Sequence, residues 1–238
     1  MLISGKVAIV TGATGALGRV VVRKLLLEGG KVVALYRNKE KFKALQEYVD
    51  DVEGLYGYEG DVTSEESCLK LIDETIRLHG YLDILVNIAG GYRGGFTLAE
   101  THMNDWDWLM NLNLKSVYLC MKAVLPHMIE RNYGKIVNIS AKTSMREGRK
   151  AKSAAYAASK AGVRVLTEAV AEEVIRYEIN VNCVMPSVID TKANRSAFPK
   201  AKHEKWVLPE EIAEAILYLV SNKAKSVRGA CLPVYGKS

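Results

Sequence analysis

Short apolar runs alternate with longer amphipathic segments along the whole chain. Seven of the apolar runs are continuous and rich in β-branched residues, which is typical of strands that are covered on both faces of a parallel sheet. These runs read KVAIVTG, KVVALYR, LYGYEGDV, ILVNIAG, KIVNIS, NVNCVMP and ACLPVYG. The segments between them predict helices at Ala16–Glu28, Glu65–Leu78, Trp106–Glu130, Ser153–Tyr177 and Pro209–Val220.

Strand–helix alternation of this kind predicts an α/β protein with right-handed crossovers. We expect a single-domain Rossmann fold: a doubly wound parallel sheet of about seven strands with helices on both faces. No repeat, linker or break in composition divides the sequence, so residues 1–238 are expected to form one domain. Thr63 and Glu66 have the spacing of a capping box, and Pro209 is suited to a first helical position.

Composition narrows the class of protein. The formal net charge of +6 fits an anionic ligand such as a phosphorylated cofactor, and no basic region interleaved with aromatics indicates nucleic acid. The four cysteines are widely spaced, with no C-x-x-C pair and no histidine at ligand spacing, so we expect reduced core thiols and no metal site. No apolar run approaches the ~18 residues needed to span a bilayer, and we expect a cytoplasmic protein without membrane contact.

A glycine-rich turn, TGATGALGR, follows the first predicted strand and opens the first predicted helix. Its glycines match G-x-x-G-x-x-G, and glycine lets the backbone approach a pyrophosphate whose charge then lies at a helix N-terminus. A tight strand–helix turn without a ligand is the alternative. The position favours a dinucleotide site formed by Gly12, Thr14, Gly15, Leu17 and Gly18.

The end of the second strand reads Tyr36-Arg37-Asn38-Lys39, with no acid before Glu40. A carboxylate here would bind the adenosine ribose hydroxyls and repel a 2′-phosphate, whereas a guanidinium suits a phosphate dianion. The sequence therefore predicts NADP(H) in preference to NAD(H), with NAD(H) possible, and contacts from Tyr36, Arg37 and Asn38. The alternative is that Arg37 and Lys39 belong to a solvated loop.

Several short motifs follow in order: DVT at Asp61, NIAG at Asn87, NLNLKS with Asn113, KIVNIS, YAASK and MPSVIDT. Together with the glycine turn, they resemble the short-chain dehydrogenase/reductase family over essentially the whole chain. The resemblance implies an NAD(P)-dependent oxidoreductase, with Tyr156 and Lys160 catalytic and Asn113 positioning a water. It implies cofactor contacts from Asp61 and Val62 at the adenine, from Asn87, Ile88, Ala89 and Gly90 along the cofactor, and from Tyr156, Lys160, Pro186, Ile189 and Thr191 near the nicotinamide.

Tyr156 and Lys160 lie one helical turn apart in an alanine-rich segment. A phenol has an ordinary pKa of about 10, and a cation within ~4–6 Å can lower it toward neutrality. We therefore expect Tyr156 to exchange a proton with a carbonyl or alcohol oxygen while hydride moves to or from the nicotinamide. Tyr118 and Lys122 have the same spacing, but they lie in the middle of another helix and indicate an ordinary surface or interface.

The family usually carries a second hydroxyl just after the strand-ending serine, and here that residue is Ala141. Three interpretations remain open. Ser140 takes the catalytic role, Thr143 or Ser144 supplies the hydroxyl from the loop, or the site works without one because its substrate is easily reduced.

The segments ISAKTS, PSVIDTKANRSAFPKAKHEKW and GACLPVYG are similar to dihydropteridine reductases, which favours a quinonoid substrate as one alternative. Reduction of a 3-oxoacyl thioester is another, and a non-catalytic NADPH-binding sensor or scaffold is an alternative of a different class. The family resemblance also implies a homodimer or homotetramer formed through the long helices at Trp106–Glu130 and Ser153–Tyr177.

Overall fold

The computed structural model describes residues 1–237 of the chain. Seven parallel strands form one sheet in the order β3-β2-β1-β4-β5-β6-β7, so the crossover direction reverses beside β1. The strands are β1 (Val7–Thr11), β2 (Lys31–Tyr36), β3 (Leu55–Glu59), β4 (Ile84–Asn87), β5 (Gly134–Ile139), β6 (Ile179–Pro186) and β7 (Cys231–Val234). The predicted doubly wound sheet of about seven strands is confirmed.

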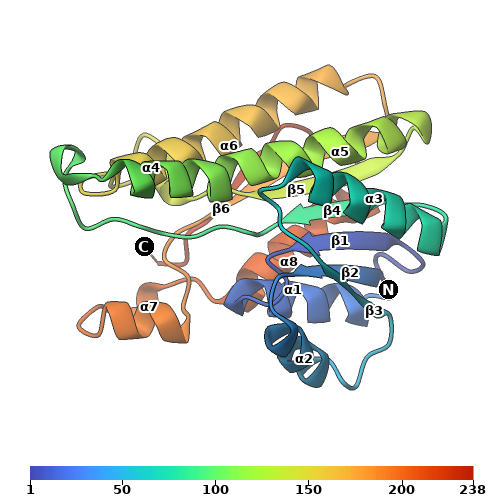
Figure 1. Ribbon diagram of the computed structural model, residues 1–238, viewed down its shortest axis with the longest axis horizontal. Helices are drawn as coiled ribbons and strands as arrows, with labels where there is room; N and C mark the ends of the chain where they lie inside the picture. Colours follow the sequence, from blue (N-terminus) through green and yellow to red (C-terminus); the bar gives the residue numbers. More distant parts are fainter. Residues whose placement is uncertain (238) are drawn as a thin grey trace.

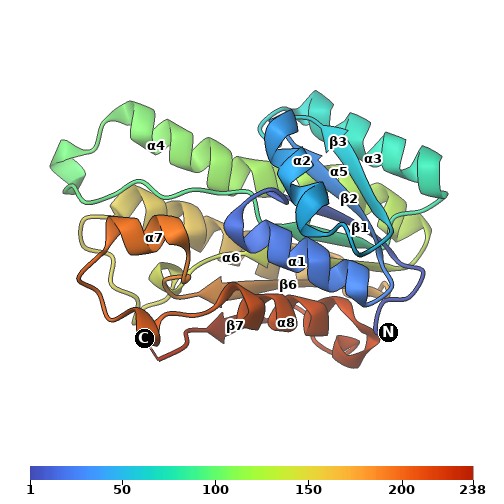
Figure 2. The ribbon, with the colours of Figure 1, turned by 90° about the horizontal axis from the view of Figure 1, so that it is seen from below.

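Helices cover both faces of this sheet. They are α1 (Ala16–Leu27), α2 (Lys39–Tyr48), α3 (Glu65–His79), α4 (Met103–Leu109), α5 (Ser116–Glu130), α6 (Ala154–Glu173), α7 (Lys192–Ala197) and α8 (Pro209–Val220). In Figure 1, α3, α5 and α6 lie above the sheet, and α1, α2 and α8 lie below it. Figure 2 shows α1 and α8 side by side on the lower face, with α7 standing out near the C-terminus.

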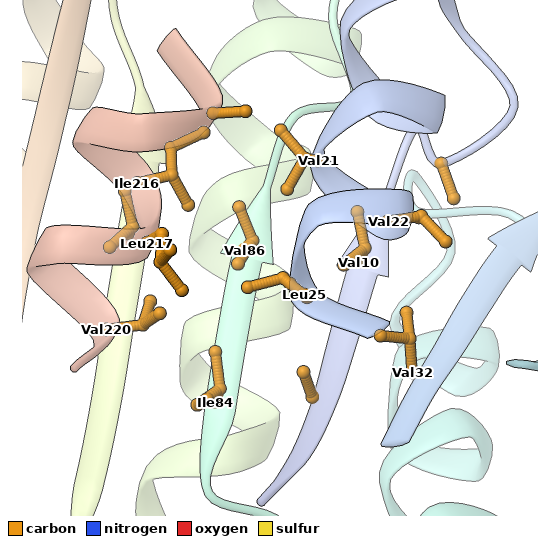
Figure 3. Packing of buried hydrophobic residues seen from close by; sticks show 14 of the residues in the cluster. Val10, Val21, Val22, Leu25, Val32, Ile84, Val86, Ile216, Leu217 and Val220 are labelled. Carbon is orange, nitrogen blue, oxygen red and sulfur yellow. The ribbon is translucent and has the colours of Figure 1, made fainter. Parts of the chain in front are cut away.

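Two apolar layers hold the helices to the sheet. In the first, Val21 and Leu25 of α1 and Ile216 of α8 pack against Val10 and Val86 of the central strands (Figure 3). All five side chains are buried, and each contributes on the order of 1.5–3 kcal/mol by leaving water. The second layer packs α3, α5 and α6 against the opposite face. Because both faces are covered, the central strands are mostly apolar, and their few buried polar residues, such as Asn87 and Asn138, bond to one another.

The predicted helix Trp106–Glu130 is in fact interrupted. α4 begins earlier, at Met103, and a π-helical turn at Met110–Lys115 separates it from α5. The wider turn brings Asn113 to the interior, where it is completely buried. A π-helical turn inside an α-helix often accompanies a functional residue, and its position depends on tertiary contacts rather than on hydrophobic periodicity.

Other helix boundaries also differ from the predictions. Helices α2 and α7 were not predicted, and the predicted capping box at Thr63 is wrong. The N-cap of α3 is Ser64, whose hydroxyl accepts a hydrogen bond from the Ser67 N–H at 3.3 Å. Thr63 instead donates its hydroxyl to Asp61 at 2.8 Å, because the turn after β3 places the two side chains together. Pro209 does occupy the first position of α8, as predicted.

The four cysteines are free thiols, as expected, although the fold brings residues distant in sequence together. The Cys68 and Cys120 sulfurs lie 3.7 Å apart between α3 and α5. Cys183 and Cys231 occupy paired positions on β6 and β7. Within residues 1–237, no helix combines the length and apolar character needed to cross a bilayer.

Candidate active site

The glycine turn connects β1 to α1 and packs against the loop that follows β4. The Thr11 hydroxyl accepts hydrogen bonds from the N–H groups of Ile88 and Ala89, at 3.1 and 3.2 Å. Gly12 has a φ of +65°, and a Cβ there would lie 2.7 Å from the Ala89 nitrogen. Glycine is therefore required at this position both by its backbone conformation and by the close approach of the neighbouring loop.

The start of α1 fits an anionic group. Its N-cap, Gly15, supplies no side-chain cap, and the first turn of the helix contains no acid. The amide N–H groups at a helix start are free of intrahelical partners and carry partial positive charge. Gly18 allows the turn to close tightly, because a Cβ there would lie 2.1 Å from the Gly12 carbonyl oxygen. Of the other residues predicted here, Thr14 is half-buried and Leu17 is buried.

The end of β2 presents the accessible cation Arg37, followed by Lys39, which is ion-paired with Glu59 at 3.4 Å. The Tyr36 ring stacks on Phe42 with centroids 4.5 Å apart, and the Asn38 side chain caps α2 by accepting a hydrogen bond from the Lys41 N–H at 2.9 Å. Arg37 between them is exposed over 66% of its side chain. The structure therefore gives Tyr36 and Asn38 structural contacts and leaves the guanidinium of Arg37 accessible.

Asp61 is the anion that faces Arg37, with Oδ2 3.9 Å from Nη1. Partial burial pushes the pKa of Asp61 up, but hydrogen bonds from Thr63 and the charge of Arg37 outweigh burial and lower the pKa overall. The neighbouring Val62 is buried. A separation of 3.9 Å between exposed groups makes only a weak ion pair, so Arg37 can turn to another anion at low cost.

Asn87, at the end of β4, begins a buried chain of amides. Its Nδ2 donates to Asn138 Oδ1 at 2.8 Å, and Asn138 Nδ2 donates to the Thr167 hydroxyl at 3.0 Å. These bonds connect β4, β5 and α6. Among the described residues, Asn87 Oδ1 is a buried acceptor without a partner. A buried polar atom of this kind costs free energy unless a ligand forms a hydrogen bond with it. The unpartnered Asn87 oxygen therefore fits a polar ligand at the end of β4.

Lys160 lies at the centre of the predicted catalytic group. It is only 5% exposed, and its Nζ donates to the Ile139 carbonyl at the end of β5 at 2.7 Å. A Cβ on Gly90 would lie 3.3 Å from this nitrogen and 2.9 Å from Asn113 Oδ1, so Gly90 leaves room for both side chains. The structure thus brings together Gly90, Asn113 and Lys160, as the sequence motifs implied.

The pKa of Tyr156 is shifted opposite to the sequence-based expectation. Burial, with a smaller effect from the Tyr92 phenol, raises the pKa of Tyr156 to about 12. Burial also lowers the pKa of Lys160 to about 8, although Cys183 acts in the other direction. The ammonium is directed at the Ile139 carbonyl, and its charge does not offset the desolvation of the phenol.

Asn113 connects the β4–α4 loop to α6, the helix that carries Tyr156 and Lys160. Its side chain accepts from the Gly91 N–H at 2.8 Å and donates to the Gly91 carbonyl at 3.0 Å. The same amide donates to the Ser159 hydroxyl at 3.1 Å, and Ser159 donates to the Tyr156 carbonyl at 2.8 Å. In this structure Asn113 therefore holds the loop and the backbone beneath Tyr156.

The hydroxyls near position 141 are directed at the backbone or enclosed. Ser140 is buried and donates to the Lys160 carbonyl at 2.7 Å, and Ser144 donates to the Ala141 carbonyl at 2.7 Å. The Thr143 hydroxyl is buried and has no partner among the described residues. These contacts engage Ser140 and Ser144 and leave Thr143 as the one of the three hydroxyls without a partner, and they give Ser140 a positioning contact with α6.

The three residues expected near the nicotinamide lie at the end of β6 and in the segment just after it. Pro186 ends that strand, and Ile189 forms an isolated parallel bridge with Val207. The Thr191 hydroxyl caps α7 by accepting from the Asn194 N–H at 3.1 Å. These contacts fix the segment at the same edge of the sheet as the glycine turn.

Two residues at the site were missed by sequence reasoning. Ser159 connects Asn113 to the Tyr156 carbonyl on α6, and its place inside the YAASK motif was a usable signal. The ring of Tyr92 packs edge-on against Tyr156 with centroids 5.0 Å apart. Tyr92 follows the NIAG motif closely, but sequence alone does not show which way a loop side chain points.

Two surface hollows lie away from this group of residues. One, of about 320 Å³, is lined by Glu168, Glu172 and Arg228, and the other, of about 490 Å³, by Asp190, Arg195 and Trp206. Neither includes Tyr156 or Lys160. We define the site by its chemistry and its place at the carboxyl ends of the strands, where doubly wound folds bind ligands.

Comparison with known proteins agrees with this architecture. The profile of the short chain dehydrogenase family matches residues 6–202. The 3-oxoacyl-[acyl-carrier-protein] reductase FabG of Thermotoga maritima is 33% identical, covering 99% of this chain and 98% of its own. The (2S)-[(R)-hydroxy(phenyl)methyl]succinyl-CoA dehydrogenase subunit BbsD of Thauera aromatica is 32% identical, with coverages of 99% and 97%. A crystal structure of NAD⁺-bound xylitol dehydrogenase superposes with a TM-score of 0.90 at 27% identity, covering 99% of this chain and all of that chain.

The chain belongs to the short-chain dehydrogenase/reductase family. It is accordingly an NAD(P)-dependent oxidoreductase of that family, as the motifs implied.

Proposed function

We propose that the protein is an NADP(H)-dependent oxidoreductase that transfers hydride between the nicotinamide and a carbonyl or alcohol substrate, with Tyr156 as the acid/base. The observation that carries the proposal is the group around Lys160. A buried ammonium one helical turn from a half-buried phenol, at the same edge of the sheet as the glycine turn, supports proton transfer beside a bound dinucleotide.

The cofactor fits the residues present. The uncapped start of α1 suits the pyrophosphate, the unpartnered Asn87 Oδ1 suits a polar group, and the Gly90 backbone leaves room beside Lys160. When bound, the nicotinamide supplies or accepts the hydride. Asp61 and Val62 are assigned to the adenine end, and Pro186, Ile189 and Thr191 to the nicotinamide end.

Tyr156 is the proton donor in the reductive direction. With a pKa of about 12, its phenol is fully protonated at neutral pH and has a proton to give to the substrate oxygen. Lys160, with a pKa of about 8, is mostly charged at pH 7. When the cofactor is bound, this ammonium would hold the nicotinamide ribose, and its charge there would favour the phenolate that remains after the proton leaves. Asn113 fixes the Gly91 backbone beside this group, and a water on its amide would return the proton from solvent.

Replacement of Tyr156 tests the proposal directly. Wild-type protein should oxidise NADPH in the presence of one or more members of a panel of ketones, 3-oxoacyl thioesters, quinones and quinonoid dihydropterin. Tyr156→Phe should lower turnover at least a thousandfold while the dissociation constant of NADPH, measured by fluorescence titration, changes little. Tyr118→Phe is the matched control, because Tyr118 and Lys122 repeat the spacing on α5 but Lys122 is ion-paired with Glu65 at 2.7 Å.

Binding of NADPH without turnover of any panel member would contradict the proposal and favour the sensor. Turnover restricted to the thioesters would support an activity like that of the Thermotoga maritima relative. The buried Ala141 stands where the family usually has a hydroxyl that donates to the substrate oxygen, and this favours a quinonoid substrate. Loss of such a donor typically costs about 10²–10³ in rate, which an easily reduced substrate tolerates.

The preference for NADP(H) rests on the accessible guanidinium of Arg37. Arg37→Asp should lower the affinity for NADPH far more than the affinity for NADH, because it removes the cation and places an anion beside the 2′-phosphate. Arg77→Asp changes the net charge equally but lies at the far end of α3, paired with Glu74 at 2.6 Å, and serves as the control. Equal losses of affinity for the two cofactors would contradict the preference.

The assembly is proposed to be a homodimer or homotetramer formed through α5 and α6, which lie next to one another on the upper face of the sheet (Figure 1). Tyr118 on α5 and Val165 on α6 are exposed over 47% and 52% of their surface. Burying such side chains against a second copy would stabilise the assembly, and light scattering measures its mass.

A further inference from the structure

Tyr92 lies in the loop that leads from β4 to α4, and its ring contacts the ring of Tyr156. The two centroids are 5.0 Å apart and the planes meet at 77°, an edge-to-face pair. Tyr92 is nonetheless 54% exposed, so one part of the ring covers Tyr156 and another faces solvent. A substrate that brings its oxygen to the Tyr156 phenol therefore comes close to an exposed aromatic surface.

The residue before Tyr92 is fixed on both sides. Both backbone polar groups of Gly91 are bonded to the Asn113 amide, at 2.8 and 3.0 Å. The Trp108 ring closes the other side, because a Cβ on Gly91 would lie 2.3 Å from its Cη2 atom. The loop therefore has little freedom to move Tyr92 along the sheet edge.

The residues after Tyr92 are also fixed. Arg93 forms an ion pair with Asp105 at 2.6 Å, and its guanidinium lies 4.2 Å above the centroid of the Trp108 ring. The Gly95 N–H donates to the Lys152 carbonyl at 2.7 Å, which ties the loop to the start of the catalytic helix. These contacts hold the ring of Tyr92 in place before any substrate arrives, so little conformational entropy is lost on binding.

Gly94 determines where the Tyr92 ring lies. A Cβ at Gly94 would approach the Tyr92 hydroxyl to 2.5 Å and Cζ to 2.8 Å. An alanine there would displace the ring while leaving the tyrosine in the sequence. The ring position can therefore be altered without changing either phenol.

The neighbouring polar groups offer a substrate little else. Ala141 carries no hydroxyl, and the Ser140 and Ser144 hydroxyls donate to backbone carbonyls. The Thr143 hydroxyl has no partner among the described residues, but it is enclosed, so the exposed face of Tyr92 is an accessible surface beside Tyr156 that can orient a substrate.

We infer that Tyr92 is a specificity-determining residue that packs against substrates whose reactive carbonyl lies on or next to a flat ring. The inference rests on the proposed function, since it concerns the same proton-donating phenol. An aromatic pair of this kind discriminates by about two- to tenfold, which would appear mainly in KM because the ring binds the substrate and moves no proton.

The test compares an aryl ketone with an n-alkyl ketone of equal carbon number, acetophenone and 2-octanone, alongside the panel described above. Tyr92→Leu removes the flat ring, and Tyr92→Phe keeps it without the hydroxyl. Tyr92→Leu should lower kcat/KM for acetophenone, relative to 2-octanone, by about fivefold through KM. Tyr92→Phe should retain the wild-type ratio, and Gly94→Ala should behave like Tyr92→Leu. Affinity for NADPH should be unchanged in all three.

An equal change for both ketones in Tyr92→Leu would overturn the inference and assign the ring a purely structural role beside Tyr156. Turnover by the wild type of linear substrates alone would also overturn it and leave the proposed function standing. Absence of turnover with every substrate of the panel would overturn the proposed function and the inference with it.

Discussion

Lys160 should make turnover depend on pH in a range where an ordinary lysine does not titrate. Its ammonium is held at the Ile139 carbonyl, 2.7 Å away, with 5% of the residue exposed. Burial lowers the pKa of Lys160 from an ordinary 10.5 to about 8, and Cys183 on β6 opposes that shift. Since the proposed mechanism needs the charged form, kcat should fall as pH rises through 8.

The size of the fall follows from the pKa. A group with a pKa of about 8 is about 91% protonated at pH 7 and about 9% protonated at pH 9, so kcat for reduction should drop about tenfold between these pH values. A lysine of ordinary pKa would remain charged throughout, and the profile would be flat. The pKa of Tyr156, raised to about 12, keeps the phenol protonated over the same interval.

Folding stability provides a second measure of the same shift, with a definite sign. Because the pKa of Lys160 is lower in the folded state, the unfolded chain binds more protons between about pH 8 and pH 10.5, and stability from this group rises with pH across that window. Between pH 8 and pH 10 the rise should be about 2 kcal/mol. Lys160→Met should lack this contribution.

The assay measures initial rates of NADPH oxidation at saturating substrate from pH 6.5 to 9.5, and urea midpoints over pH 7 to 10. Lys122→Met is the matched control, because Lys122 lies on α5 and is ion-paired with Glu65 at the surface. It should reproduce the wild-type profiles, whereas Lys160→Met should lose most activity. A flat wild-type rate profile, together with identical urea titrations for wild type and Lys160→Met, would refute the reasoning.

Three further predictions concern the glycine turn, the amide under the loop and a buried carboxylate. Gly15→Asp should lower the affinity for NADPH at least tenfold, because the carboxylate repels the pyrophosphate. Tm should stay unchanged or rise slightly, because aspartate is a good N-cap and a Cβ there meets only the Gly12 carbonyl at 3.2 Å. A lowered Tm would contradict this. Asn113→Ala should cost about 1–3 kcal/mol in urea unfolding and Ser159→Ala distinctly less, since only the first leaves the Gly91 backbone unpaired. Asp83→Ala should lower the free energy of unfolding by about 3–5 kcal/mol, because the buried carboxylate accepts from the Val7 N–H at 3.1 Å and from Arg131 at 3.2 Å. The pH dependence of kcat should be that of the wild type.

The central strands were predictable because they are buried on both faces and are therefore mostly apolar, whereas the edge strands β3 and β7 are partly exposed. The glycine turn and the Tyr156–Lys160 pair were predictable for a related reason, since each depends on residues within one turn or one helix. The error at Thr63 shows the limit of local reasoning. Thr63 and Ser64 are both suitable caps, and the bonds between Thr63 and Asp61 leave Ser64 to cap α3.

The sequence by itself therefore determined the alternation of strands and helices, the family and the identity of the two principal catalytic candidates. Only the tertiary structure decided the environment of those candidates. The Ile139 carbonyl in β5 accepts from Lys160, and Tyr92 in the β4–α4 loop packs against Tyr156. Asn113, in a π-helical turn, contacts Ser159 between them on α6. A pKa depends on how much water these neighbours displace and on which atoms face the charge, and neither quantity is encoded in the spacing of two residues on one helix.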